Sequence, residues 1–109
     1  MGAFSQKKGR KGEIEFRDLL RENGISAYRN DQRGQGGQDN PDIGGLAGCH
    51  IEVKRREHLS LNAALDQATA DSGGALPVVA HRVNRRPWVI SMRLDDWLQL
   101  YEAWRGQTV

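Results

Sequence analysis

The segment 50–54, with the sequence His-Ile-Glu-Val-Lys, most strongly constrains how this chain can fold. Its polar and apolar residues alternate, which is the pattern of a β-strand whose two faces have different surroundings. Side chains of a strand point to opposite faces in turn, so Glu52 and Lys54 share one face. We therefore expect a sheet that holds an acid and an amine side by side. His50 falls on the same face as Glu52.

A second short strand is predicted just upstream, at Asp42–Ile43. Pro41 begins it, at the position where the missing N–H of proline harms a sheet least. The glycines between the two strands allow a tight return of the chain. We therefore expect Asp42 and Glu52 to meet across a hairpin.

Two carboxylates and one amine at one place suit metal-assisted cleavage of a phosphodiester. Mg²⁺ takes one or two protein carboxylates and keeps several waters. The metal would activate a bound water, and Lys54 would orient that water or neutralise charge on the phosphate. The alternative is a solvated or ion-paired strand face, since an acid-x-Lys pair is common on surfaces.

The basic residues gather in clusters, although the net charge is only +2 and the isoelectric point is about 9.0. Clusters of this kind favour a polyanionic partner, nucleic acid above all, over a solvated face. The clusters are Lys7, Lys8, Arg10 and Lys11; Arg55 and Arg56; and Arg82, Arg85 and Arg86.

Other classes of protein are disfavoured by what the sequence contains. The single cysteine, Cys49, excludes an internal disulfide and fits a reducing compartment. There is no apolar run long enough to cross a membrane and no signal-peptide core, so we expect a cytoplasmic protein. The glycines of Asn30–Asn40 are not followed by Gly-Lys-Ser/Thr, so no nucleotide cofactor is expected.

The predicted elements run in the order helix, three strands, helix, two strands, helix. Residues 1–9 are expected to form a flexible basic arm, and 10–109 a single domain. The polar, glycine-rich segment Asn30–Asn40 is expected to be a loop. This order predicts an α/β fold with a mixed five-stranded sheet between helices. The strands are expected at Ile25–Arg29, Asp42–Ile43, Cys49–Lys54, Leu76–His81 and Trp88–Ser91.

Three helices are predicted from apolar spacing and from their end signals. The first spans Arg10–Asn23, the second runs from a Ser60 cap to Asp71, and Asp95 caps the last. The last helix carries an aromatic stripe at spacings of four and three residues, which favours a core or a dimer interface over a base-stacking surface. The stripe consists of Trp97, Tyr101 and Trp104.

Taken together, these motifs resemble the PD-(D/E)xK nuclease superfamily, and within it the archaeal-type Holliday junction resolvases and their phage or bacterial relatives. The resemblance covers nearly the whole chain, with the motifs in the family's order. They are Lys8–Glu13, Ala27–Asn30, Pro41–Ile43, Ile51–Lys54, the Gly-Gly-x-x-Pro segment within Ser72–Ala80, and Trp88–Ile90.

The resemblance implies a restriction-endonuclease-like core and a set of site residues. Asp42, Glu52 and the backbone carbonyl of Val53 match the metal ligands, and Lys54 matches the catalytic lysine. Glu13 matches a first-helix acid that joins the metal directly or through water. Its competitor is Glu15, which points further toward solvent on a helical projection, and the spacing from Lys8-Gly9 also selects Glu13.

The resemblance also implies the partners. They are Mg²⁺, with Mn²⁺ as a substitute, branched DNA, and a second copy in a homodimer that makes two cuts. Gln67 on the second helix is a secondary candidate for the site. The residues expected to bind DNA are Lys7, Lys8, Arg10, Lys11, Arg29, Arg33, Arg55 and Arg56.

Two alternatives remain open for the substrate. The segment before Asp42 is longer than in the archaeal resolvases and contains no serine, so the chain also fits another structure-selective or nicking nuclease of this superfamily, acting on a flap or nick or resembling the VRR-NUC type. The other alternative is a non-catalytic DNA-binding module with the same fold.

Overall fold

A computed structural model describes residues 2–30 and 40–107, with side chains from residue 9 onward. The order of helices and strands is the predicted one. The elements are α1 (Gly2–Glu22), β1 (Tyr28–Arg29), β2 (Ile43–Gly44), β3 (Cys49–Arg55), α2 (Leu61–Asp71), β4 (Leu76–Arg82), β5 (Val89–Ser91) and α3 (Leu94–Gly106).

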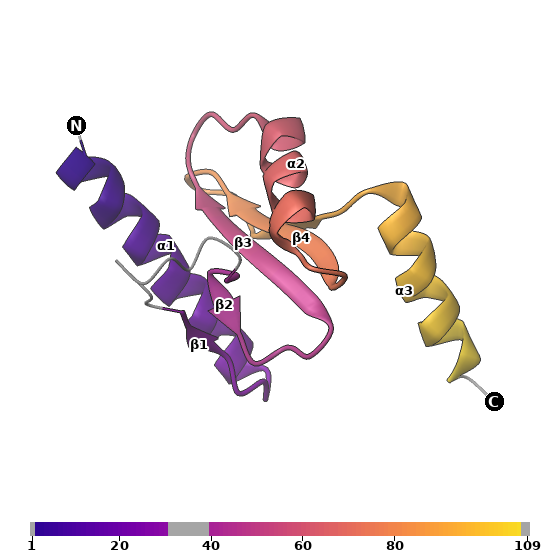
Figure 1. The fold of residues 1–109 in the computed structure, drawn as a ribbon. Coiled ribbons are helices and arrows are strands. Elements are labelled where there is room, and N and C mark those ends of the chain that lie inside the picture. Colours follow the sequence, from indigo (N-terminus) through magenta and orange to yellow (C-terminus); the bar gives the residue numbers. More distant parts are fainter. Residues whose placement is uncertain (1, 31–39, 108–109) are drawn as a thin grey trace.

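The five strands form one mixed sheet in the order β1-β2-β3-β4-β5. β3 and β4 run parallel, and the other neighbours are antiparallel. Parallel neighbours need a long crossover, and α2 provides it (Figure 1). The α/β fold with a mixed five-stranded sheet is thereby confirmed.

Helices cover both faces of the central strands. α1 packs Phe16 on the face that carries Ile51 and Val53. α2 packs on the opposite face, where it meets Val79 of β4. The two long strands are therefore buried on both sides, as parallel pairs usually are, and the short strands β1, β2 and β5 lie toward the edges (Figure 1).

Two helix starts differ from the prediction. α1 begins at Gly2, so the expectation of a flexible arm over 1–9 is wrong for residues 2–9. No proline interrupts this stretch, and a glycine inside a helix costs only about 1 kcal/mol. α3 begins at Leu94 with Arg93 as its N-cap, so Asp95 lies in the first turn instead of capping it. Ser60 is the N-cap of α2, although its hydroxyl makes no capping hydrogen bond.

The aromatic stripe of α3 lies outside the core of the described chain. Trp97, Tyr101 and Trp104 are exposed and stack only on one another. The reason is the direction of α3, which leads away from the sheet instead of returning over it (Figure 1). The prediction that this stripe belongs to the core is therefore wrong. The alternative, that it forms a dimer interface, stays a prediction.

Close packing of α1 on β3 depends on the absence of a side chain at Gly12. A Cβ added at Gly12 would lie 2.5 Å from the Cβ of Arg55, which is too close for any real pair of carbons. Gly9, one turn earlier on the same helix, has nothing within 4 Å of the equivalent position. The two glycines therefore offer a matched pair for testing this contact.

We predict opposite effects of alanine at these two positions. Gly12→Ala should lower the free energy of unfolding by about 1–3 kcal/mol, because the new methyl pushes α1 away from β3. Gly9→Ala should raise it by about 0.5–1 kcal/mol through helix propensity alone. Urea unfolding of both variants measures this, and stabilisation by both would contradict the packing.

Candidate active site

The Asp42 carboxylate is held against β3 by a hydrogen bond from the backbone. The N–H of Val53 donates to Oδ2 of Asp42 at 2.8 Å. The N–H of Asp42 itself donates to the carbonyl of Ile51 at 2.9 Å, beside the Ile43–Ile51 pair of the hairpin. The expected meeting of Asp42 with the Glu52 region is therefore present.

Glu52 lies in surroundings that oppose its ionisation. Its side chain is only 12% exposed. Burial, the charge and hydrogen bond of neighbouring Asp42, and the charge of Asp71 together raise its pKa from 4.5 to about 8, and burial contributes most. The charge of Lys54 acts in the opposite direction. A cation at this place would reverse the balance, because it favours the ionised form of both carboxyls.

Lys54 follows Glu52 at the alternate position of β3. It is half-buried, and its charge is felt by Glu52. Across residues 9–30 and 40–107, no hydrogen bond or ion pair engages its ammonium group. The ammonium group is thus near enough to Glu52 for its charge to lower the pKa of that acid.

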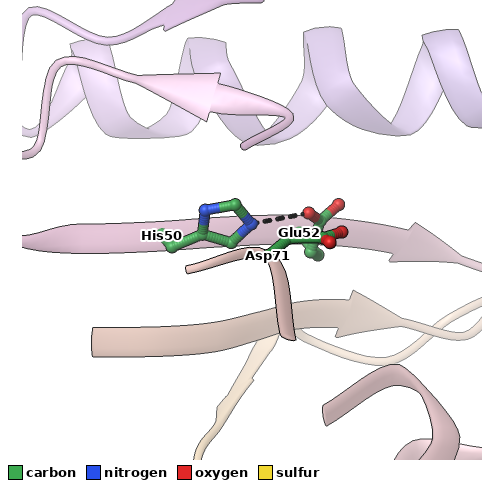
Figure 2. A group of neighbouring side chains, drawn as sticks. All are labelled: His50, Glu52 and Asp71. Atoms are coloured by element: carbon green, nitrogen blue, oxygen red, sulfur yellow. Dashed lines mark hydrogen bonds and ion pairs between the residues drawn. The ribbon is translucent and has the colours of Figure 1, made fainter. Parts of the chain in front are cut away.

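A third acid and a histidine join Glu52 on the face that α2 covers. Nε2 of His50 lies 2.9 Å from Oε1 of Glu52, and the histidine side chain is 3% exposed. Asp71, the last residue of α2, places a carboxylate within 4.8 Å of both (Figure 2). Strand alternation predicted the position of His50. Nothing in the sequence predicted Asp71, whose position depends on how α2 packs.

The structure separates the two candidate acids of α1, Glu13 and Glu15. Oε1 of Glu13 forms an ion pair with Arg29, 3.1 Å from both Nε and Nη2. Glu15 instead accepts hydrogen bonds from Arg82 and, at 2.8 Å, from Nε1 of Trp88. Glu15 therefore ties α1 to β4 and to the segment before β5, while Glu13 is paired with a residue of β1.

In the Glu13–Arg29 pair, Arg29 lies on β1, which β2 separates from the strand of Glu52. Arg29 pairs with Ile43, the residue after Asp42. Glu13 is not a member of the His50, Glu52 and Asp71 group. Gln67, the secondary candidate, donates from Nε2 to Oδ2 of Asp71 at 2.8 Å, so it reaches this group through Asp71.

The predicted DNA-binding residues differ in their exposure. Arg10, Lys11 and Arg56 are exposed. Arg55 is largely covered, with Nη2 donating to Oδ1 of Asn84 at 2.8 Å and with Nη1 buried. The side chains of Lys7, Lys8 and Arg33 lie outside the described residues.

Basic clusters that are distant in sequence converge at one end of the sheet. Arg55 and Arg82 are partners in the parallel register of β3 and β4, so these two arginines, each the last residue of its strand, lie side by side. Gly12 and Glu15 place the middle of α1 at the same end. Lys54 precedes this end by one residue, which puts the positive charge beside the acid pair.

Comparisons with known proteins support this fold. None of the known protein-family models matches the chain, and no protein with a curated description does. Among solved structures, the chain is similar to Hjc, a Holliday junction resolvase from the archaeal hyperthermophile Archaeoglobus fulgidus. The two are 28% identical over 77% of this chain and 76% of that one, with a TM-score of 0.57.

This similarity supports a resolvase-like nuclease fold with a restriction-endonuclease-like core. Among the described residues, no helix is both long and apolar enough to span a membrane.

The buried acid pair predicts a specific pH dependence of stability for the metal-free protein. Below pH 4.5 both the folded and the unfolded chain hold the Glu52 proton. As the pH rises from 4.5 to about 8, the unfolded chain loses this proton first, so the free energy of unfolding falls. Glu52→Gln cannot ionise, so it should be more stable than the parent by about 2–4 kcal/mol at the upper pH and equal to it at the lower.

Urea unfolding in EDTA at several pH values measures this difference. Glu22→Gln, at an exposed position at the end of α1, serves as the control and should show no such trend. A difference between Glu52→Gln and the parent that stays constant across the range would contradict the environment described for Glu52.

Proposed function

We propose that this protein is a Mg²⁺-dependent endonuclease that cleaves branched DNA, with the four-way Holliday junction as its substrate. The observation that carries the proposal is the close, partly buried pair of Asp42 and Glu52, with Lys54 near enough for its charge to act on Glu52. Similarity to an archaeal Holliday junction resolvase supports both the chemistry and the substrate.

The donor set fits a hard divalent cation. Asp42 and Glu52 supply carboxylate oxygens, and a cation between them would relieve the conditions that keep Glu52 protonated. The carbonyl of Val53 is proposed as a third ligand, and Glu13 as a ligand reached directly or through water. When bound there, Mg²⁺ or Mn²⁺ supplies an activated water and stabilises charge on the phosphate.

Lys54 is proposed as the catalytic amine. Its ammonium group orients the attacking water or neutralises the charge that develops on the phosphate oxygens. Water adds to phosphorus, the P–O3′ bond breaks, and the 3′-oxygen takes a proton. The products are a 5′-phosphate and a 3′-hydroxyl.

The exposed basic residues are proposed to hold the DNA backbone. Arg10, Lys11 and Arg56 are placed at the basic end of the sheet, where duplex phosphates would approach Lys54. Arg29 is half of an ion pair with Glu13, so we propose that it acts by fixing Glu13 and by adding positive charge near Asp42. Lys7, Lys8 and Arg33 complete the proposed set.

We predict that the protein cuts a four-way junction in Mg²⁺ and that Asp42→Asn, Glu52→Gln and Lys54→Met each slow cleavage by at least about 100-fold. Asp95→Asn, at an exposed acid of α3, should cut like the parent. Flap, nicked and linear duplexes assayed in parallel define the substrate.

The results of these cleavage assays distinguish the proposed resolvase from the two alternative functions. Faster cleavage of a flap or nick than of the junction would replace the resolvase with another structure-selective nuclease. DNA binding without any metal-dependent cleavage would indicate a binding module. Unchanged cleavage by the three site variants would remove the site assignment.

A homodimer is part of the proposal, because resolution of a junction needs two symmetric cuts. The apolar side of α3 is available to form it. Six large apolar side chains are exposed there, which is more than a solvated helix normally carries. They are Leu94, Trp97, Leu98, Leu100, Tyr101 and Trp104.

We predict that the parent sediments as a dimer and that the double substitution of Trp97→Ser and Trp104→Ser shifts it to a monomer, because the stripe loses most of its apolar area. The control is Leu19→Ser, which removes an exposed apolar side chain from α1. A parent that sediments as a monomer at micromolar concentration would contradict the proposed assembly.

A further inference from the structure

His50 and Asp71 lie next to Glu52, which is a proposed Mg²⁺ ligand, but neither residue is itself a proposed ligand of that ion. Both reach Glu52 from the side that α2 covers, whereas Asp42 reaches it across the hairpin. Figure 2 shows His50 and Glu52 on β3 with the Asp71 carboxylate beside them. Glu52 is thus shared between two groups of potential ligands.

The spacing of this group suits a metal ion. One ligand atom from each of His50, Glu52 and Asp71 lies within 4.8 Å of the others. Ligand atoms about 2.1 Å from a common ion are roughly 3.0–4.2 Å apart, so small side-chain shifts bring them to bonding distance. The 2.9 Å contact between His50 and Glu52 already falls near this range.

The position of Asp71 is electrostatically unfavourable without a cation. It is the last residue of α2, where the helix dipole is negative and disfavours an acid. It also faces Glu52, and the charge of Asp71 opposes ionisation of Glu52. Two acids brought together at the negative end of a helix are stabilised by a bound cation, and His50 adds a neutral donor.

Neighbouring residues also restrict the orientation of His50 and Asp71, as they do for the ligands of metal sites. His50 is nearly fully buried on a long central strand, so its ring has little freedom. Asp71 accepts a hydrogen bond from Gln67 at 2.8 Å, which fixes one carboxylate oxygen from outside the group. Partners of this kind orient ligands, and losing them typically lowers metal affinity by about 10–100-fold.

The donor types indicate which ion would bind. Imidazole nitrogen suits first-row transition ions such as Mn²⁺, Co²⁺ and Zn²⁺, whereas Mg²⁺ prefers oxygen. We propose that His50, Glu52 and Asp71 form a second cation site that takes a first-row transition-metal ion and shares Glu52 with the Mg²⁺ site. The second site itself stands without the proposed function; only the Mg²⁺ site with which it shares Glu52 rests on that function.

The competing explanation is that His50 only positions Glu52 through their hydrogen bond. Titration of the metal-free protein with Co²⁺ distinguishes the two, because the visible spectrum of Co²⁺ reports nitrogen ligation and low coordination number. We expect His50→Gln and Asp71→Asn each to weaken Co²⁺ binding by at least about tenfold and to change the spectrum. Mg²⁺ binding, measured by calorimetry, should stay within about twofold of the parent in both variants, because the oxygen ligands of the Mg²⁺ site remain.

The control is His81→Gln, which removes a histidine from neighbouring β4 that is hydrogen-bonded to Ser91 at 2.8 Å. It should bind Co²⁺ like the parent. Asp42→Asn should keep the Co²⁺ spectrum, which shows that the two sites are separable. Parent-like Co²⁺ binding by His50→Gln, or equal loss of Co²⁺ and Mg²⁺ binding, would overturn the second site.

The proposed nuclease fails by a different result. Absence of junction cleavage with an intact His50-dependent Co²⁺ spectrum would remove the function and leave the second site in place.

Discussion

The hydrogen bond from the N–H of Val53 to the carboxylate of Asp42 is the interaction on which the candidate site depends. It fixes the acid that directly precedes β2 against the central strand that carries Glu52 and Lys54. The backbone of Asp42 is held as well, by a hydrogen bond from its N–H to the carbonyl of Ile51. With both hydrogen bonds, two carboxyls lie together where water is largely excluded, and the pKa of Glu52 rises to about 8. The raised pKa of Glu52 costs stability above the ordinary pKa of a glutamate, and the proposed cation would offset that cost.

The fold places an acidic and a basic group at successive parts of the same strand, since Glu52 is the middle residue of β3 and Arg55 is its last. His50, Glu52 and Asp71 gather where α2 ends. Arg55 and Arg82 lie side by side at the carboxyl ends of β3 and β4, where α1 approaches through Gly12. A polyanion attracted to the basic end would meet Lys54 first and the carboxyl pair next. The parallel pairing of β3 and β4, which only a crossover helix permits, produces both groups at once.

The fold and the strand-borne part of the site were predictable because they follow from local rules. Strand alternation placed Glu52 and Lys54 on one face, and the proline and glycines around Asp42 predicted the hairpin. Tertiary packing decided the rest. The sequence could not show that Asp71, at the end of α2, would lie close to His50. It also could not show that Glu15 would accept a hydrogen bond from Trp88, or that Glu13 would pair with Arg29. The direction of α3 was equally hidden, because an apolar stripe looks the same whether a core or a second chain covers it.

The most direct test of the central claim is anomalous diffraction from a crystal of the protein soaked in Mn²⁺. A Mn²⁺ peak is predicted between the carboxylates of Asp42 and Glu52, with the carbonyl of Val53 as a further ligand, and it should disappear in Asp42→Asn. A crystal of the parent protein with no peak between these two carboxylates, at a Mn²⁺ concentration that supports cleavage, would contradict it.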